Sequence, residues 1–479
     1  MTARAIAAAV SSLEAAFGER LSRHEAVREQ HSHTVAGHAG QWPDAVLFAR
    51  STDEVAEAVR TCARHRCPIV PFGIGSSLEG QVNAPLGGVS IDLTQMDRVL
   101  AINAMDMDVR VQPGVTRRQL NEELRATGLF FPIDPGADAS LGGMAATRAS
   151  GTNAVRYGTM KDAVLAVEAV MADGRVIRTG GRARKSAAGY DLTRLLVGSE
   201  GTLGIITELT IRLHGIPEAV AGGICSFRSI GDACRAATDC LLHGIPVARI
   251  ELLDDVQVRA CNAYSDCSLP EQPLLLLEFH GSEASVDEQS GQFEAIAHQH
   301  GAENFAASSD PDERTRLWKV RHDAYWAARA LMPSADVTIT DVCVPISRLA
   351  ECVEATQADI AESGITAPIV GHVGDGNFHC IALAPKHDAV LAETILEFSR
   401  RLSQRAIDMG GTCTGEHGIG QGKCDYLLAE AGDAVLTMQA IKRALDPDNI
   451  LNPGKIFSPS QGGAYDGSDS SSAMTALTS

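Results

Sequence analysis

The order of apolar and polar positions predicts short helices alternating with short strands, in two runs separated by one break. In the first run, apolar residues recur at helical spacing over 53–65, with Thr52 as the predicted N-cap, and again over 117–126. Apolar and β-branched runs that end at turn residues predict strands over 67–71, 89–93, 109–111, 164–171, 176–179 and 204–213. The segment His214-Gly215-Ile216-Pro217 breaks this alternation and is the predicted domain boundary.

The alternation resumes after residue 217. It predicts strands over 222–227, 250–253, 274–280 and 341–345, and helices over 230–243, 284–300, 347–363 and 386–408. Three stretches differ. Residues 1–21 have helical spacing, with Ser11 or Ser12 as the predicted N-cap; Gly136 to Gly158 turn too often for a regular element; and 461–479 are low-complexity sequence.

Charge and cysteine spacing exclude several function classes. The chain carries 41 Lys and Arg against 60 Asp and Glu, a net charge of −19, which argues against nucleic-acid and anionic-membrane partners. Its twelve cysteines include no CxxC pair, as expected of buried thiols in a reducing compartment. No apolar run could span a bilayer, and Glu14 and Glu19 are untypical of a transit peptide. We therefore expect a cytoplasmic protein.

Glycine-rich turns cluster in the first half of the chain. Residues 71–80, Pro-Phe-Gly-Ile-Gly-Ser-Ser-Leu-Glu-Gly, follow a predicted strand and can expose backbone N–H groups to a pyrophosphate. Their spacing is not the GxGxxG of a nicotinamide site. Similar turns recur at 135–137, 140–143, 150–153 and 198–204. Together they predict backbone held close against a large flat ligand that carries phosphates.

Two histidines flank an Asp-Gly dipeptide in the second half. Asp-Gly favours a two-residue hairpin turn, which at Asp375-Gly376 would place His372 directly opposite His379 on one face of a sheet. Such a pair can share one metal ion. Further along, Glu416 and His417 lie between glycines, and a His-His-Glu set with an open position is typical of catalytic metal sites.

A third candidate site lies in the segment 318–326. If this segment is one helix, Arg321 and Tyr325 share a face, and His322 and Trp326 share the neighbouring one. The guanidinium of Arg321 suits a substrate carboxylate, although a solvent-exposed arginine on an amphipathic helix remains the alternative.

The glycine-rich segments 71–80, 140–158 and 184–207 together resemble the FAD-binding domain of the vanillyl-alcohol oxidase/PCMH flavoproteins. Over about residues 40–457, the chain resembles the FAD-linked D-lactate and D-2-hydroxyacid dehydrogenase branch, to which the glycolate oxidase FAD subunit is closely related. Arg148 departs from the pattern, since many relatives have Asn there. No histidine lies in the first glycine loop, so the resemblance implies non-covalent FAD.

The resemblance also implies roles for individual residues. The residues expected to bind FAD are Phe72, Gly73, Gly75, Ser76, Ser77, Pro135, Gly136, Leu141, Gly142, Gly143, Ser150, Gly151, Asn153, Gly158, Glu200, Gly201, Gly204, Ile206 and Asn452. The expected metal ligands, which also contact substrate, are His372, His379 and Glu416, holding zinc, manganese or iron. His417 would be the general base, and Arg321 and Trp326 would bind substrate.

The fold expected from the resemblance is α+β, with an FAD-binding domain of two subdomains over 1–217 and an antiparallel-sheet cap over 218–445. Residues 446–458 would return to the FAD domain, and 459–479 would form a flexible tail. The expected reaction is metal-assisted oxidation of a D-2-hydroxy acid by FAD. Its acceptor would be a quinone, a cytochrome or an electron-transfer flavoprotein, with a peripheral membrane position if it is a quinone. The sequence leaves a homodimer open.

Alternative functions remain at this stage. A His-His-Glu metal hydrolase would be colourless, and a passive FAD subunit of a glycolate-oxidising complex would have no need of the metal residues. Relatives that oxidise 2-hydroxyglutarate have an Asn two positions after the second histidine, where this chain has Ile381, and a Lys after the arginine helix, which is absent here. We therefore expect a short or apolar substrate, D-lactate first.

Overall fold

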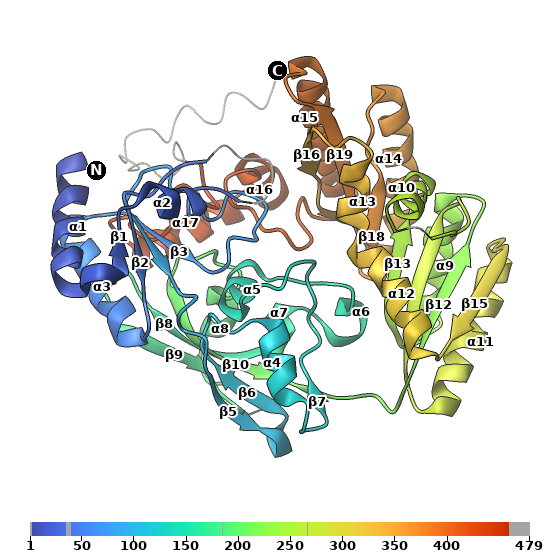
Figure 1. The fold of residues 1–479 in the computed structure, drawn as a ribbon, viewed down its shortest axis with the longest axis horizontal. Coiled ribbons are helices and arrows are strands. Elements are labelled where there is room, and N and C mark those ends of the chain that lie inside the picture. The colour runs from blue at the N-terminus through green and yellow to red at the C-terminus, as the bar shows by residue number, and fades with distance from the viewer. Residues whose placement is uncertain (1, 35–39, 184, 266, 459–479) are drawn as a thin grey trace.

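The computed structural model describes residues 2–34, 40–183, 185–265 and 267–458, so the predicted tail lies outside the described residues. Figure 1 shows two halves, with the N-terminal half coloured blue to green and the second half yellow-green to orange. The red C-terminal helices lie against the N-terminal half. The expected α+β fold class is confirmed.

The N-terminal half contains two subdomains. The first is the sheet β1-β2-β4-β3, in which β2, β4 and β3 are parallel, with three helices; its elements are α1 (Ala3–Phe17), β1 (Leu21–Ser22), α2 (Glu25–Gln30), β2 (Ala45–Phe48), α3 (Thr52–His65), β3 (Ile69–Phe72) and β4 (Val89–Asp92). The second is the antiparallel sheet β5-β6-β10-β8-β9, formed by β5 (Val99–Asn103), β6 (Asp108–Val111), β8 (Val164–Val170), β9 (Val176–Gly180) and β10 (Ile205–Arg212). Around this sheet lie α4 (Arg117–Leu124), β7 (Leu129–Phe130), α5 (Leu141–Thr147), α6 (Ala154–Tyr157), α7 (Met160–Ala163), α8 (Leu192–Leu196) and β11 (His214–Gly215).

Two predicted helix starts in this half are wrong. The N-cap of α3 is Ser51, whose Oγ accepts from the N–H of Glu54 at 3.3 Å, and Thr52 is already helical. The N-cap of α1 is Thr2. Ser12 instead lies within the helix, and its hydroxyl donates to the carbonyl of Ala8. The glycine-rich stretch 136–158 also contains two short helices, α5 and α6, where no regular element was predicted.

The second half is built on one antiparallel sheet in the order β15-β12-β14-β13-β18-β19-β16, with β17 also pairing with β19. Its strands are β12 (Ala219–Ser226), β13 (Val247–Leu253), β14 (Leu274–Gly281), β15 (Asn304–Ser308), β16 (Ala335–Ile339), β17 (Val342–Cys343), β18 (Ile369–His372) and β19 (Asn377–Pro385). Its helices are α9 (Ile230–Leu242), α10 (Asp255–Ser265), α11 (Glu283–Gln299), α12 (Pro311–His322), α13 (Ala324–Ala330), α14 (Leu349–Ser363) and α15 (Ala389–Asp408). Strands β15 and β16 had not been predicted.

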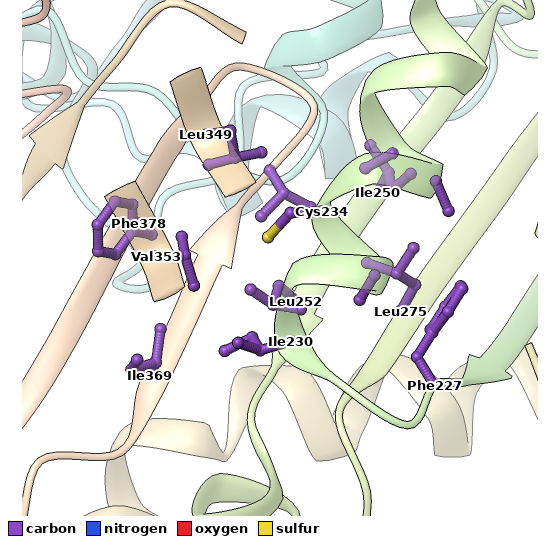
Figure 2. Packing of buried hydrophobic residues seen from close by; sticks show 14 of the residues in the cluster. Phe227, Ile230, Cys234, Ile250, Leu252, Leu275, Leu349, Val353, Ile369 and Phe378 are labelled. Atoms are coloured by element: carbon purple, nitrogen blue, oxygen red, sulfur yellow. The ribbon is translucent and has the colours of Figure 1, made fainter. Parts of the chain in front are cut away.

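Helices cover both faces of this sheet, which explains why β14 begins with four consecutive leucines. Leu275 and Leu277 pack in the core shared with α9, α11, α14 and α15, whereas Leu274 and Leu276 pack in the core shared with α10, α12 and α13. Since side chains alternate along a strand, burial on both sides requires an uninterrupted apolar run. Figure 2 shows part of the first core, including Phe227, Ile230, Leu275 and Phe378.

Replacing Phe227 with alanine tests this core. The ring is fully buried, so we expect Phe227→Ala to lower the free energy of unfolding by about 3–5 kcal/mol. Leu242→Ala is the matched control, because Leu242 is 72% exposed and its truncation should change stability by less than about 0.5 kcal/mol. Denaturant unfolding of both variants measures the difference; equal midpoints would contradict the packing described.

The chain returns to the N-terminal half after the second sheet. Beyond α16 (Cys424–Ala431) and α17 (Ala434–Leu445), the Ile69 N–H donates to the carbonyl of Ile450 at 2.7 Å, and the Asn452 N–H donates to the carbonyl of Ile69 at 2.7 Å. Within α17, Lys442 donates to the carbonyl of Thr202 at 2.8 Å. The segment after residue 445 therefore extends along β3, and α17 already contacts the N-terminal half.

Candidate active site

A cavity of about 450 Å³ lies where the two halves meet. Glycine loops of the N-terminal half and polar side chains of both halves line its wall. Of the residues expected to bind FAD, those on the wall are Phe72, Gly73, Gly75, Ser76, Ser77, Pro135, Gly136, Gly142, Gly143, Ser150, Glu200, Gly201, Gly204, Ile206 and Asn452. The wall also includes Arg321, Trp326, His372, His379, Glu416 and His417. The structure thus brings together the glycine loops, the histidines and the arginine, which are far apart in sequence.

Four of the residues expected to contact FAD do not lie on this wall. Leu141 is fully buried in the core of the second subdomain. The side-chain amide of Asn153 donates to the carbonyl of Pro132, and its oxygen accepts from Arg249. At Gly151 and Gly158 the backbone is pressed against Asp134 and Asp162 instead.

The wall fits a bound cofactor with phosphates. The hydroxyls of Ser77 and Ser140 are buried on the wall, and neither has a hydrogen-bond partner among the described residues. Buried hydroxyls without partners are costly, so such atoms point to a missing ligand. A Cβ added at Gly73 would lie 2.4 Å from the Ser140 hydroxyl, and one at Gly142 would lie 2.4 Å from Pro113, so these loops stack too closely for side chains.

The hairpin that carries the two histidines has a different register from the one predicted. The turn has four residues, 373–376, so His372 pairs with Asn377 and His379 pairs with Val370. The Asp-Gly dipeptide is the second half of this turn rather than a complete two-residue turn. A shift of two residues keeps both histidines on the same face, diagonal rather than opposite, with ring centroids 5.6 Å apart.

Three side chains converge as a metal site requires. The Nε2 atoms of His372 and His379 each lie 3.3 Å from the same oxygen of Glu416. His379 directs Nδ1 at the carbonyl of Thr340, and His372 directs Nδ1 at a carboxylate oxygen of Glu251, at 3.0 and 2.7 Å. Both partners can only accept, so each Nδ1 carries a proton, and each Nε2 faces Glu416 across a gap that a proton or a metal cation can fill.

The charges of the cluster also favour a cation. Burial raises the pKa of Glu416, but His372 and His379 outweigh burial and hold that pKa well below its usual range. Burial lowers the pKa of His372, but Glu251 and Glu416 outweigh it and hold the pKa well above its usual range. The pocket therefore stabilises positive charge beside Glu416, and the residues present fit a divalent metal ion.

A second triplet, Asp341, His379 and His417, is also close enough to share an ion. Its carboxylate is already used. One oxygen of Asp341 accepts from Asn377 at 2.8 Å, and the other accepts from the Thr414 hydroxyl and from the N–H groups of Glu416 and His417, at 2.7, 3.0 and 2.9 Å. Asp341 thus fixes the segment that carries Glu416 and His417 rather than holding metal.

His417 is placed to take a proton. Its ring stacks on that of His379 with centroids 5.0 Å apart, and its buried Nδ1 has no hydrogen-bond partner among the described residues. Burial lowers the pKa of His417, which favours the neutral imidazole that a general base requires.

Arg321 reaches the cavity from the end of α12. The single helix predicted over 318–326 is wrong, because α12 ends at His322 and α13 begins at Ala324. The Nε of Arg321 donates to Glu251 at 2.7 Å, and the other oxygen of Glu251 binds His372. One buried carboxylate therefore orients both the arginine and a metal-site histidine. Trp326, on α13, is half-exposed at the cavity wall.

Sequence reasoning missed the two buried carboxylates that organise this site, Glu251 and Asp341. The available signal was a lone acidic residue in or beside an apolar strand segment: Glu251 between Ile250 and Leu252, and Asp341 directly before Val342. A buried carboxylate needs a partner, and here the partners are His372, Arg321 and the N–H groups of the His417 segment.

Comparison with known proteins identifies both halves of the chain. Residues 216–456 match the model described as "FAD linked oxidases, C-terminal domain", and residues 43–180 match "FAD binding domain". The "Probable D-lactate dehydrogenase, mitochondrial" of Danio rerio is 50% identical over 95% of this chain and 93% of that protein. The "D-lactate dehydrogenase (cytochrome), mitochondrial" of Arabidopsis thaliana is 47% identical over 87% and 74%. "Glycolate oxidase subunit GlcD" of Bacillus subtilis is 35% identical over 87% and 89%.

The expected cytoplasmic location is contradicted by these relatives, because the two dehydrogenases are named as mitochondrial proteins and so point to mitochondria. Glu14 and Glu19 were a poor guide, since two charges say little about targeting. Separately, none of the described helices is long and apolar enough to cross a bilayer.

A solved structure shows the same fold. The 4-ethylphenol oxidase of Gulosibacter chungangensis superposes with a TM-score of 0.77 over 96% of this chain and 99% of that one, at 21% identity. Taken with the family matches, this places the fold among the vanillyl-alcohol oxidase/PCMH flavoproteins. The chain belongs to the FAD-linked oxidase family, in the branch that contains D-lactate dehydrogenases and the glycolate oxidase subunit, and it is an FAD-dependent oxidoreductase.

Proposed function

We propose that this protein oxidises a D-2-hydroxy acid, D-lactate first, to the 2-keto acid and passes the electrons to an acceptor other than NAD. The observation that carries the proposal is that one cavity joins the glycine loops of the FAD half to a His-His-Glu cluster, a histidine and an arginine. The names of the D-lactate dehydrogenases that are 47–50% identical support the choice of substrate.

Each polar group has a distinct task in this proposal. Arg321, held by Glu251, binds the substrate carboxylate and so orients the C–H bond within the cavity. His417 accepts the proton of the substrate hydroxyl. His372, His379 and Glu416 would hold a zinc, manganese or iron ion. The ion would supply Lewis-acid polarisation of the hydroxyl. Non-covalent FAD on the glycine loops would supply the two-electron oxidant.

The part of the wall around Arg321 and the histidines favours a short or apolar substrate tail. Ile339, Val370 and Ile381 line it, and Ile381 is 3% exposed. Neither Lys319 nor Arg329, the cations nearest in sequence to Arg321 and Trp326, lines the cavity: Lys319 pairs with Asp323, and Arg329 packs on the ring of Trp326. His322 lines the wall, but its Nδ1 is bound by the carbonyl of Trp318. A second carboxylate would therefore be buried against isoleucine.

A substrate series tests this assignment. We expect D-lactate and D-2-hydroxybutyrate to bleach the bound flavin under anaerobic conditions, with kcat/KM at least about 100-fold above that of D-2-hydroxyglutarate, because an unpaired buried charge costs several kcal/mol. An added methylene should be tolerated, since its burial contributes about 0.8 kcal/mol. L-lactate is the control for stereochemistry. A preference for the dicarboxylate or for an L-isomer would contradict this view of the pocket.

The second candidate is the FAD subunit of a glycolate-oxidising complex, which the 35% identity to the Bacillus subtilis subunit favours. It predicts that the purified chain is yellow but is bleached by no 2-hydroxy acid on its own. For the acceptor, the cytochrome-linked name of the Arabidopsis relative supports a cytochrome over a quinone or an electron-transfer flavoprotein. Reduction of a cytochrome by the D-lactate-reduced protein, measured by absorbance, tests that choice.

A further inference from the structure

The segment that carries Glu416 and His417 is fastened at two ends by different halves of the protein. At its first end, Asp341 of the second half binds the N–H groups of Glu416 and His417. At its second end, one oxygen of Glu200 accepts from the N–H of Ile419 at 2.7 Å, and the other accepts from the N–H of Gly420 at 2.8 Å. Glu200 belongs to a glycine loop of the FAD half and is 5% exposed.

Further contacts from the FAD half support the same attachment. The side-chain amide of Gln81 donates to the carbonyl of His417 at 2.8 Å. The side-chain amide of Asn452 donates to the carbonyls of Gln81 and Glu200, at 3.1 and 2.7 Å, which ties the two holding residues together. The approach is close, because a Cβ added at Gly418 would lie 2.7 Å from the Glu200 carboxylate.

These contacts change the role expected for Glu200. The resemblance predicted a contact with FAD, but both carboxylate oxygens are engaged by the backbone of 419–420. Burial raises the pKa of Glu200 to about 7, and the two N–H donors act against burial by stabilising the ionised form. Glu200 nevertheless lines the cavity wall, next to Gly201. The same residue thus belongs to the flavin cavity and binds the segment of the proposed base.

We propose that Glu200 is a positioning residue for His417. It fastens the His417 segment to the wall of the flavin cavity, so that the base keeps a fixed position relative to the flavin. This inference rests on the proposed function, in which His417 is the base. Asp341 holds Glu416 independently of Glu200, so the metal site and the Arg321 site should survive the loss of the Glu200 contact. Its loss should therefore affect the rate of proton removal more than the binding of substrate, FAD or metal.

The test is Glu200→Gln, which preserves shape but presents an amide N–H₂ to one of the two backbone N–H donors. We expect faster hydrogen exchange in the peptide 415–422, with and without bound FAD. We also expect the limiting rate of flavin reduction by D-lactate to fall on the order of 10- to 100-fold. The half-saturating lactate concentration and the FAD and metal contents should stay unchanged. Glu208→Gln is the matched control, since Glu208 pairs with Arg110 away from the cavity wall and should change none of these quantities.

Unchanged exchange in 415–422 would overturn the proposal, and so would faster exchange with an unchanged reduction rate. If Glu200→Gln loses FAD, Gln81→Met removes the hydrogen bond from Gln81 to the carbonyl of His417 without altering Glu200. Hydrogen exchange in 415–422 and the rate of flavin reduction, measured on that variant, then test the proposal. If the unmodified protein is bleached by no 2-hydroxy acid, the proposed function fails, whereas hydrogen exchange still reports whether Glu200 holds the segment.

Discussion

Replacing His417 with alanine is expected to lower the rate of flavin reduction by D-lactate by about 10²- to 10⁴-fold, the usual contribution of a general base. FAD should stay bound, because the carbonyl of His417, not its ring, is what Gln81 holds, and alanine keeps that carbonyl. Stopped-flow absorbance of the flavin measures the rate, and the visible spectrum of the protein after desalting measures retained cofactor.

His243→Ala is the matched control for that experiment. His243 is an exposed histidine after α9, and its loss should leave both flavin content and reduction rate unchanged. If His417→Ala retains more than a few per cent of the reduction rate, His417 is not the base.

Removal of the metal should stop turnover almost as completely. Dialysis against a chelator is expected to lower the rate at least about 100-fold, because the substrate hydroxyl loses the cation that stabilises its ionised form. His379→Ala should act likewise, since it removes one of the three proposed ligands and leaves only His372 and Glu416 to hold the ion. The protein should remain yellow in both cases, because the glycine loops are separate from the metal cluster.

Three measurements make that prediction decisive. Elemental analysis should find about one equivalent of zinc, manganese or iron in the active protein and little after dialysis, and adding the metal back should restore the rate. His298→Ala is the control variant, as His298 is exposed on α11 and remote from the cluster. A full reduction rate in a sample shown to be metal-free would refute the metal assignment.

Local patterns predicted the fold well where one face of an element is buried. Amphipathic spacing identified α3, α9, α11 and α15, and the glycine-rich turns mark loops that stack against one another. Register was harder to predict. The Asp-Gly dipeptide indicated a turn near residue 375, but its length depends on the pairing of β18 with β19. Local turn preference cannot resolve that choice, because a shift of two residues leaves the same side chains on the same face.

The site was predictable only as far as its motifs are contiguous. His372, His379, Glu416 and His417 lie in two short segments, whereas the residues that orient them come from distant strands and loops. Glu251 lies on β13, Asp341 lies before β17, and Glu200 lies before β10. Each is a carboxylate buried against donors from another part of the chain, and no local pattern specifies such a partner.

The path of the C-terminal segment determines the order in which the parts of this protein can complete their folding during translation. Residues 450–452 line the edge of β3, and Ile450 and Leu451 belong to the core of the first subdomain. β3 is translated early, but this neighbour leaves the ribosome only near the end of synthesis. The second sheet, by contrast, is contiguous in sequence from β12 to β19 and can assemble while translation continues. The flavin-binding half, although it comes first in sequence, is therefore the last to be completed, and a nascent chain that stalls before residue 450 lacks part of the core beside its cofactor cavity.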